Sequence, residues 1–92
     1  MRFHRFDLNL LVALDALLTE RNVTRAAQRL NIGQSAASSA LGRLREYFQD
    51  ELLVPSGREL RVSALGQTLI EPVRATLRQA QATLQLQPGF DP

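Results

Sequence analysis

Residues 23–48 contain two segments with helical periodicity, and only Asn-Ile-Gly separates them. The first segment, VTRAAQRL, is short, and QSAASSALGRLREYF is longer. Both repeat apolar residues at the spacing that places them on one side of a helix. These positions are Val23, Ala27, Leu30, Ala37, Leu41, Leu44 and Phe48. A short helix, a glycine-containing turn and a longer helix predict a helix-turn-helix motif over residues 23–42, whose second helix continues to about Phe48.

A leucine-rich segment before this motif predicts another helix over residues 7–21. Asp7 is a suitable N-cap for it, and Asn22 is expected to end it and to cap the next helix. The leucines occupy more than one side, so we expect this helix to be buried on more than one side. They are Leu8, Leu10, Leu11, Leu14, Leu17 and Leu18.

Two short apolar pieces follow the motif, at residues 52–54 and 60–62. They flank Pro-Ser-Gly-Arg, a composition that favours a turn. This pattern predicts a small β-hairpin, or wing, over residues 52–62. We therefore expect residues 6–63 to form a mainly α winged helix-turn-helix domain, with a three-helix core and a two-stranded wing.

Residues 64–86 carry a long apolar stripe, which predicts a linker helix capped by Ser63 and kinked near Pro72. The later apolar positions are spaced like a coiled-coil seam, which favours pairing with a second copy of the chain. The alternative is that the stripe packs on its own domain. The predicted dimerisation residues are Leu69, Val73, Leu77, Ala80 and Leu84. Residues 87–92 are rich in helix breakers and are expected to begin a hinge.

The composition is compatible with one small domain and excludes several classes of protein. The 92 residues include 11 basic side chains, all of them arginine, and no cysteine. Arginine binds phosphate through bidentate contacts, although a GC-rich genome would also favour arginine over lysine. The absence of cysteine excludes disulfides and thiol catalysis. No apolar run is long enough to cross a bilayer, so a cytoplasmic protein is the default expectation.

The helix predicted over residues 34–48 has a side that carries only small or uncharged polar residues. Ser35, Ser39 and Gly42 lie opposite the apolar positions, Ser38 lies toward the edge, and Gln34 stands at the N-terminal end. Serine and glycine are poor helix formers, and a merely solvated side would more often carry Glu, Lys or Gln. We therefore predict that this side contacts DNA, where serine and glutamine form hydrogen bonds and Gly42 permits close approach.

Several neighbouring residues are candidates for phosphate contacts. Thr24 and Arg25 lie near the start of the first motif helix, and Arg58 and Arg61 lie on the predicted wing. For each arginine the alternative is a surface ion pair with Asp or Glu. That alternative is strongest for Arg43 and Arg45, which we expect to be structural.

The sequence contains no arrangement of residues that is typical of catalysis. It has one histidine, scattered carboxylates and no glycine-rich phosphate loop. We therefore predict that the protein is not an enzyme and needs neither a cofactor nor a metal ion.

Residues 6–86 resemble the N-terminal winged helix-turn-helix domain of LysR-type transcriptional regulators. The similar pieces are TRAAQRL, Gln-Ser-Ala-Ala-Ser at 34–38, LGRL, ELL and GREL followed by RVS. Within that family, the N-terminal DLNLLVALDALLTERN and the C-terminal FDP are most similar to nodulation-gene activators and to regulators of aromatic-compound degradation.

The resemblance implies a homodimer joined through the linker helix, which often assembles further as a dimer of dimers. It implies binding to an interrupted palindrome in promoter double-stranded DNA, with contacts from Thr24, Arg25, Gln34, Ser35, Ser38 and Ser39. It also implies an effector domain, outside this chain, that senses a small inducer, for which the subgroup suggests an aromatic compound. A different class of function remains open, namely a helical dimerisation module whose Ser/Gly side docks protein.

The sequence departs from the usual family pattern at the presumed DNA surface. The family's usual Ser-Gln-Pro before the recognition helix is Gly33-Gln34-Ser35 here. Ser39 and Pro55 occupy positions where the family commonly has arginine, so Arg58 is the expected wing contact.

Overall fold

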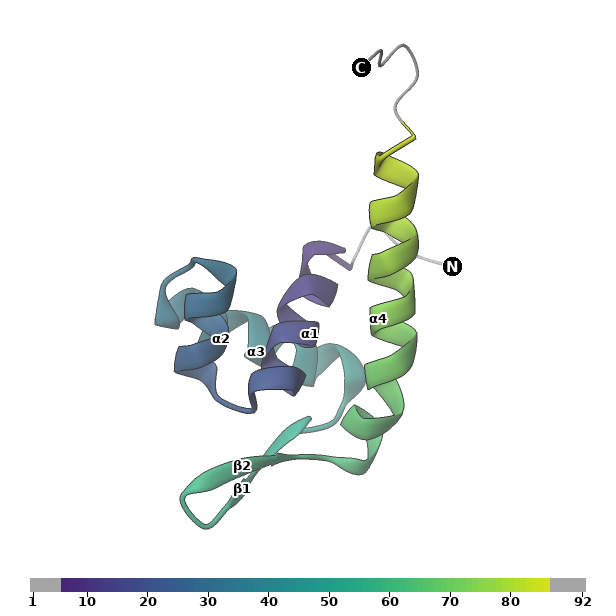
Figure 1. Cartoon of the computed structure of the whole chain (residues 1–92). Helices are drawn as coiled ribbons and strands as arrows, with labels where there is room; N and C mark the ends of the chain where they lie inside the picture. The colour runs from purple at the N-terminus through teal and green to yellow at the C-terminus, as the bar shows by residue number, and fades with distance from the viewer. Residues whose placement is uncertain (1–5, 87–92) are drawn as a thin grey trace.

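The computed structural model describes residues 6–86, which form four helices and a two-stranded antiparallel ribbon (Figure 1). This arrangement confirms the mainly α, winged helix-turn-helix fold with a long C-terminal helix. The predicted hinge at 87–92 lies outside the described residues. In chain order the elements are α1 (Asn9–Glu20), α2 (Val23–Leu30), α3 (Gln34–Phe48), β1 (Leu53–Ser56), β2 (Glu59–Val62) and α4 (Ala64–Leu84).

The turn between α2 and α3 is fixed by backbone hydrogen bonds and by one left-handed residue. Asn31 has a φ of 60°, a conformation that asparagine tolerates better than most residues. The N–H of Ile32 donates to the carbonyl oxygen of Ala27 at 3.0 Å, which closes the end of α2. Gly33 is extended and precedes α3 without a side-chain cap. The two motif helices therefore meet at the predicted place.

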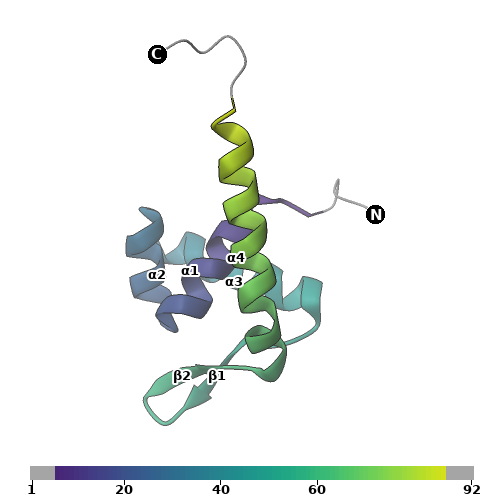
Figure 2. The same ribbon diagram turned by 45° about the vertical axis from the view of Figure 1, so that its right-hand side comes forward.

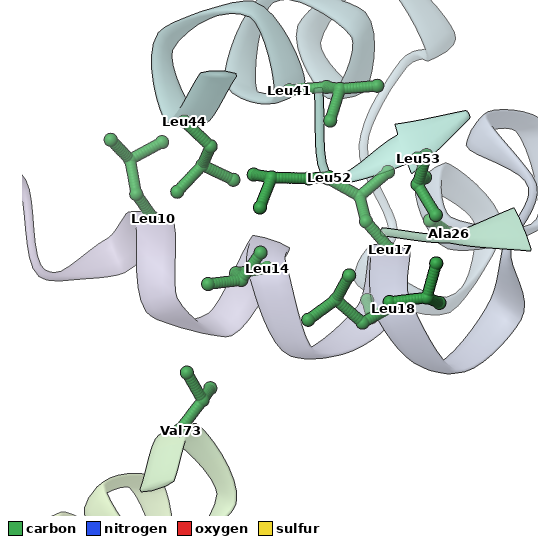
Figure 3. Close-up of a cluster of buried hydrophobic side chains, with 12 residues drawn as sticks. Leu10, Leu14, Leu17, Leu18, Ala26, Leu41, Leu44, Leu52, Leu53 and Val73 are labelled. Carbon is green, nitrogen blue, oxygen red and sulfur yellow. The ribbon is translucent and has the colours of Figure 1, made fainter. Parts of the chain in front are cut away.

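Helix α1 is buried on two sides, as its leucine pattern predicts. Figure 3 shows Leu44 of α3 and Leu52 on one side of α1, while Val73 of α4 approaches from the other side. Leu14 and Leu17 of α1 are fully buried. Burying one such side chain stabilises the fold by about 1.5–3 kcal/mol, so α1 supplies a large share of the core.

The start of α1 differs from the prediction. The helix begins at Asn9, and Leu8 occupies the N-cap position without a side-chain cap. Asp7 still stabilises the first turn, because its Oδ1 accepts a hydrogen bond from the N–H of Asn9 at 2.9 Å. Leu8 was predicted to join the buried stripe but is 55% exposed. Its backbone is already helical, with φ of −61° and ψ of −21°, and it lies one turn before Val12, which is 45% exposed, so this side of the helix start faces solvent.

The wing is present, but it begins later and turns later than predicted. Leu52 has a φ of 67° and is fully buried, so it ends the connection from α3 rather than starting β1. Pro55 lies in β1, paired with Leu60, because the unpaired edge of a two-stranded ribbon tolerates a residue without an N–H. Gly57, whose φ is 63°, starts the tight turn.

A hydrogen-bonded junction ties the end of α3, the wing and the start of α4 together. The buried Ser63 hydroxyl donates to Asp50 Oδ2 at 2.6 Å and accepts from the N–H of Gly66 at 3.0 Å. Asp50 Oδ2 also accepts from the N–H of Leu52 at 2.8 Å. The Ser63 hydroxyl, followed by the Leu52 amide, lowers the pKa of Asp50 by stabilising the carboxylate. The predicted Ser63 cap is confirmed.

Helix α4 packs on its own domain at its N-terminal half and projects away from it at its C-terminal half (Figure 2). Val73 is 5% exposed against the core. Beside it, the Arg74 guanidinium lies 3.3 Å from Asp15 Oδ1 and donates to Thr19 Oγ1 at 2.9 Å, both on α1. Leu84 is 70% exposed. The helix continues through Pro72 and ends at Leu84 rather than at 86. None of the four helices in residues 6–86 combines the length and the apolar character that a membrane span requires.

Replacing Gly66 with alanine is expected to lower the free energy of unfolding by about 1–3 kcal/mol through overpacking. A Cβ at this position would lie 2.6 Å from Val62 Cγ1 and 3.2 Å from the Leu52 carbonyl oxygen. The matched control is Gly42→Ala, where nothing lies within 4 Å of the new Cβ, so a gain of about 0.5–1 kcal/mol is expected. Urea denaturation measures both variants. Equal stabilities for the two variants would contradict the close packing at Gly66.

Candidate nucleic-acid interface

The exposed side of α3 contains every residue that the sequence assigned to it. Ala37, Leu41 and Leu44 turn inward and are buried, so helical geometry directs the opposite positions outward. Nothing lies within 4 Å of a Cβ built on Gly42, so the backbone there is open to close approach. All members of this recognition surface are exposed: Gln34, Ser35, Ser38, Ser39 and Gly42.

The N-terminal end of α3 adds backbone donors to this surface. The first helical hydrogen bond runs from the N–H of Ala37 to the carbonyl oxygen of Gly33 at 3.1 Å. The preceding amides of α3 have no carbonyl partner within the helix, and Gly33 offers no side chain to cap them. Free N–H groups and the positive end of the helix dipole favour a phosphate or a base acceptor here.

The corner between α1 and α2 lies on the same side of the molecule as the ribbon of β1 and β2 (Figures 1 and 2). A cleft separates the start of α2 from the tip of the wing. Its volume is about 620 Å³. It brings together Thr24 and Arg25 from α2 with Arg58 from the wing, three of the predicted contacts that lie far apart in the sequence. Arg61 is exposed but does not line the cleft. The full lining is Glu20, Arg21, Asn22, Val23, Thr24, Arg25, Arg58, Glu59 and Leu60.

The start of α2 is fixed by the Asn22 side chain. Its Oδ1 accepts a hydrogen bond from the N–H of Arg25 at 2.8 Å, which confirms the predicted cap. Asn22 leaves the N–H groups of Val23 and Thr24 without helical partners, as at any helix start. The residues that line the cleft therefore carry free amides, a hydroxyl and three guanidinium groups, those of Arg21, Arg25 and Arg58.

Two carboxylates line the same cleft and were not among the predicted site residues. Glu20 ends α1, and Glu59 begins β2. The Arg25 Nε lies 3.8 Å from Glu20 Oε1, with the Arg25 side chain 63% exposed. Spacing in the sequence did not indicate this arrangement, because the corner between α1 and α2 and the fold of the wing create it.

Arg45 has a structural role, as the sequence analysis expected, although its partners are different. Its Nε donates to the carbonyl oxygen of Glu51 at 2.7 Å, and its Nη2 donates to that of Leu53 at 2.9 Å. These bonds hold the connection between α3 and β1. Arg43 is exposed, and its predicted structural role stays a prediction.

The described residues contain no group of three or more His, Cys, Asp or Glu side chains placed to hold a metal ion. The functional groups on the two surfaces are hydrogen-bond donors and acceptors and, in the cleft, charged side chains of both signs. The recognition surface combines small hydroxyl side chains with the N-terminus of α3. The cleft combines arginines with the N-terminus of α2.

Comparison with known proteins supports a regulatory role. Nodulation protein D 2 from Rhizobium leguminosarum bv. phaseoli is 53% identical over all 92 residues, which cover only 29% of that protein. The chain thus spans less than a third of this relative. A solved probable transcriptional regulator from Pseudomonas aeruginosa is 41% identical with a TM-score of 0.84, over 98% of this chain and 30% of that one.

A second solved structure shares the fold. The BenM DBD, crystallised in complex with catB site 1 DNA, gives a TM-score of 0.80 at 22% identity. The match covers 88% of this chain and 91% of that one. At this identity the likeness concerns the fold alone.

The family model described as bacterial regulatory helix-turn-helix protein, lysR family, matches residues 8–67. Its members are regulators, which confirms the prediction that this chain is not an enzyme. The match covers α1 to the first turn of α4, and thus the recognition surface, the cleft and the wing. This chain therefore belongs to the lysR family of bacterial regulatory helix-turn-helix proteins.

Proposed function

We propose that this chain binds promoter double-stranded DNA in a sequence-dependent way, with α3 in the major groove. The observation that carries the proposal is the recognition surface of α3, which is exposed, uncharged and built from small or polar residues. A BenM domain with the same fold has been crystallised with DNA, which supports this use of the fold. The alternative, a dimerisation module without DNA binding, is not favoured by the family match.

Sequence preference then arises without arginine on the recognition surface. Bidentate arginine–guanine pairs are the commonest direct contacts, and none is available from Gln34, Ser35, Ser38 or Ser39. Gln34 can pair with an adenine edge, and serines can bond bases or phosphates directly or through water. The open backbone at Gly42 permits a close fit that depends on DNA shape.

The cleft beside the wing is the proposed site for the DNA backbone. Arg25 and Thr24 on one wall and Arg58 on the other would bind phosphate oxygens, together with the free amides at the start of α2. Arg61 does not line the cleft, so we assign it to a phosphate outside this cleft. Because the phosphate contacts come from the cleft and the wing, the recognition surface of α3 can bind DNA without charged side chains.

We also propose that the chain forms a homodimer through the free half of α4. Ala80 and Leu84 are exposed, Leu77 is partly buried, and Leu69 packs against the core beside Val73. Val73 is already buried within its own domain, so its contribution to pairing is small. A homodimer would bind two half-sites of an interrupted palindrome.

The complete regulator is proposed to sense a small inducer through a separate domain and to act in the bacterial cytoplasm, where promoter DNA is found. The support is the 53% identity with a nodulation protein of which this chain covers 29%. The resemblance to nodulation activators favours an aromatic inducer and further assembly as a dimer of dimers.

The proposal predicts DNA binding that depends on both sequence and salt. A duplex selected from a random library by repeated binding to the 92-residue chain should bind more tightly than a scrambled duplex. Six phosphate contacts per dimer, from Arg25, Arg58 and Arg61 of each protomer, predict a loss of about 1,000-fold in affinity between about 50 and about 200 mM salt. Fluorescence anisotropy measures both effects. Affinity that ignores salt and sequence would contradict the proposal.

Replacing Ser38 with glutamate should abolish binding to the selected duplex without unfolding the chain. Ser38 is exposed on the recognition surface, so the added charge would lie against the DNA and not in the core. Ala82→Glu adds the same charge at an exposed position near the end of α4, on the side opposite Ala80 and Leu84, and should bind like the unmodified chain. Unchanged affinity in Ser38→Glu would show that another surface contacts DNA.

Replacing Leu84 with aspartate should convert the dimer to a monomer in light scattering. The side chain is 70% exposed, so thermal stability of the domain itself should change little. Ala82→Asp, on the opposite side of the same helix turn, serves as the control and should remain dimeric. A monomeric unmodified chain, or a dimeric Leu84→Asp variant, would exclude pairing through this part of α4.

A further inference from the structure

Arg25, the proposed phosphate contact on α2, is restrained by a carboxylate in the same cleft. Its Nε lies 3.8 Å from Glu20 Oε1, and its Nη2 donates to the Glu20 carbonyl oxygen at 3.4 Å. The Arg25 side chain is 63% exposed, whereas that of Glu20 is 28% exposed. The carboxylate is therefore the fixed partner and the guanidinium is the one that can move.

Glu20 is also paired with a second cation, so its charge stays compensated when Arg25 moves to another partner. The Arg29 Nη1 lies 3.5 Å from Glu20 Oε2, on the other oxygen of the same carboxylate. Arg29 also lies 3.4 Å from Asp15, so its position does not depend on Arg25. When Arg25 turns away, Glu20 keeps a charged partner.

The cleft offers Arg25 an alternative partner. Arg58 on the wing and Thr24 on α2 line the same 620 Å³ space, and a phosphate there would be within a region of several donors. Nε and Nη2 of Arg25 are the groups that face Glu20. A phosphate bound bidentately through these two groups would therefore replace the contact with Glu20.

We propose that Glu20 is a positioning residue that competes with DNA phosphate for Arg25 and so lowers the affinity for DNA. The inference rests on the proposed function, since it assigns a competitor to the phosphate contact proposed above. Exposed charges near 4 Å apart interact weakly in water, so the competition is modest. Removing the Glu20 charge should raise the affinity by about three- to tenfold.

The test measures binding of the selected duplex by Glu20→Gln, at low and moderate salt. Gln keeps the size of the side chain and removes its charge, and the expected result is a three- to tenfold lower Kd on the scale of the charge interaction above. Glu71→Gln is the matched control, because Glu71 is an exposed carboxylate on α4 that does not line the cleft. It should change the affinity by less than the Glu20 variant does.

A double-mutant cycle separates competition for Arg25 from simple repulsion of the phosphate. Arg25→Gln alone should weaken binding. In Glu20→Gln combined with Arg25→Gln, the gain caused by the Glu20 change should fall to less than about twofold, because the group that Glu20 restrains is gone. A gain that persists in full without Arg25 would mean that Glu20 repels DNA directly, and would overturn the proposal.

The remaining outcomes are also decisive. If the unmodified chain binds the selected duplex and Glu20→Gln binds equally well, the inference is wrong while the proposed function stands. If the unmodified chain binds no duplex with sequence preference, the proposed function itself is wrong. Thermal unfolding checks that the variants are folded. Should Glu20→Gln be unfolded, Glu20→Asp replaces it, since the shorter acid holds Arg25 less closely and should give a smaller gain.

Discussion

The burial of α1 between α3 and α4 is the interaction on which the rest of the structure depends. Leu14 and Leu17 are fully buried, and Val73 reaches α1 from the side opposite Leu44. Because one helix supplies apolar contacts in two directions, a chain of this size obtains a core without aromatic side chains at its centre. The wing joins the same core through Leu53 and Val62 at its base, which leaves its tip free.

Because α1 supplies much of the buried apolar surface, α3 needs to contribute less to the stability of the core. Helix α3 is anchored by the buried Ala37, Leu41 and Leu44, with Ala40 and Phe48 partly buried against the core. Its outward side can then consist of serine and glycine, which contribute little to helix stability. The same division applies to α2, where Ala26 and Ala27 are buried and the start of the helix faces the cleft. The exposed sides of α2 and α3 can therefore carry polar residues without changing the buried contacts of the same helices.

Local signals allowed most of the fold to be predicted from the sequence. Asn22 and Ser63 cap the helices that they precede, and the periodicity of α3 placed its exposed side correctly. Leu52 could not be placed, because its left-handed conformation results from tertiary burial and not from local preference. The heptad-like stripe of α4 could not reveal that Val73 packs within its own domain. Likewise, the Glu20–Arg25 pair forms only after α1 and α2 turn at their corner.

The attachment of α4 to α1 has a consequence for the spacing of binding sites along DNA. Val73 is buried against the core and Arg74 bonds to Asp15 and Thr19, so the root of α4 is held by both packing and charge. The Asp50–Ser63 junction fixes the same root to the end of α3. In a dimer joined through the exposed C-terminal half of α4, the two α3 helices would have a fixed separation and a fixed angle. The dimer would then select an operator by the number of base pairs between its half-sites, which sets the faces of the DNA helix on which they lie. This spacing would matter as much as the bases within each half-site.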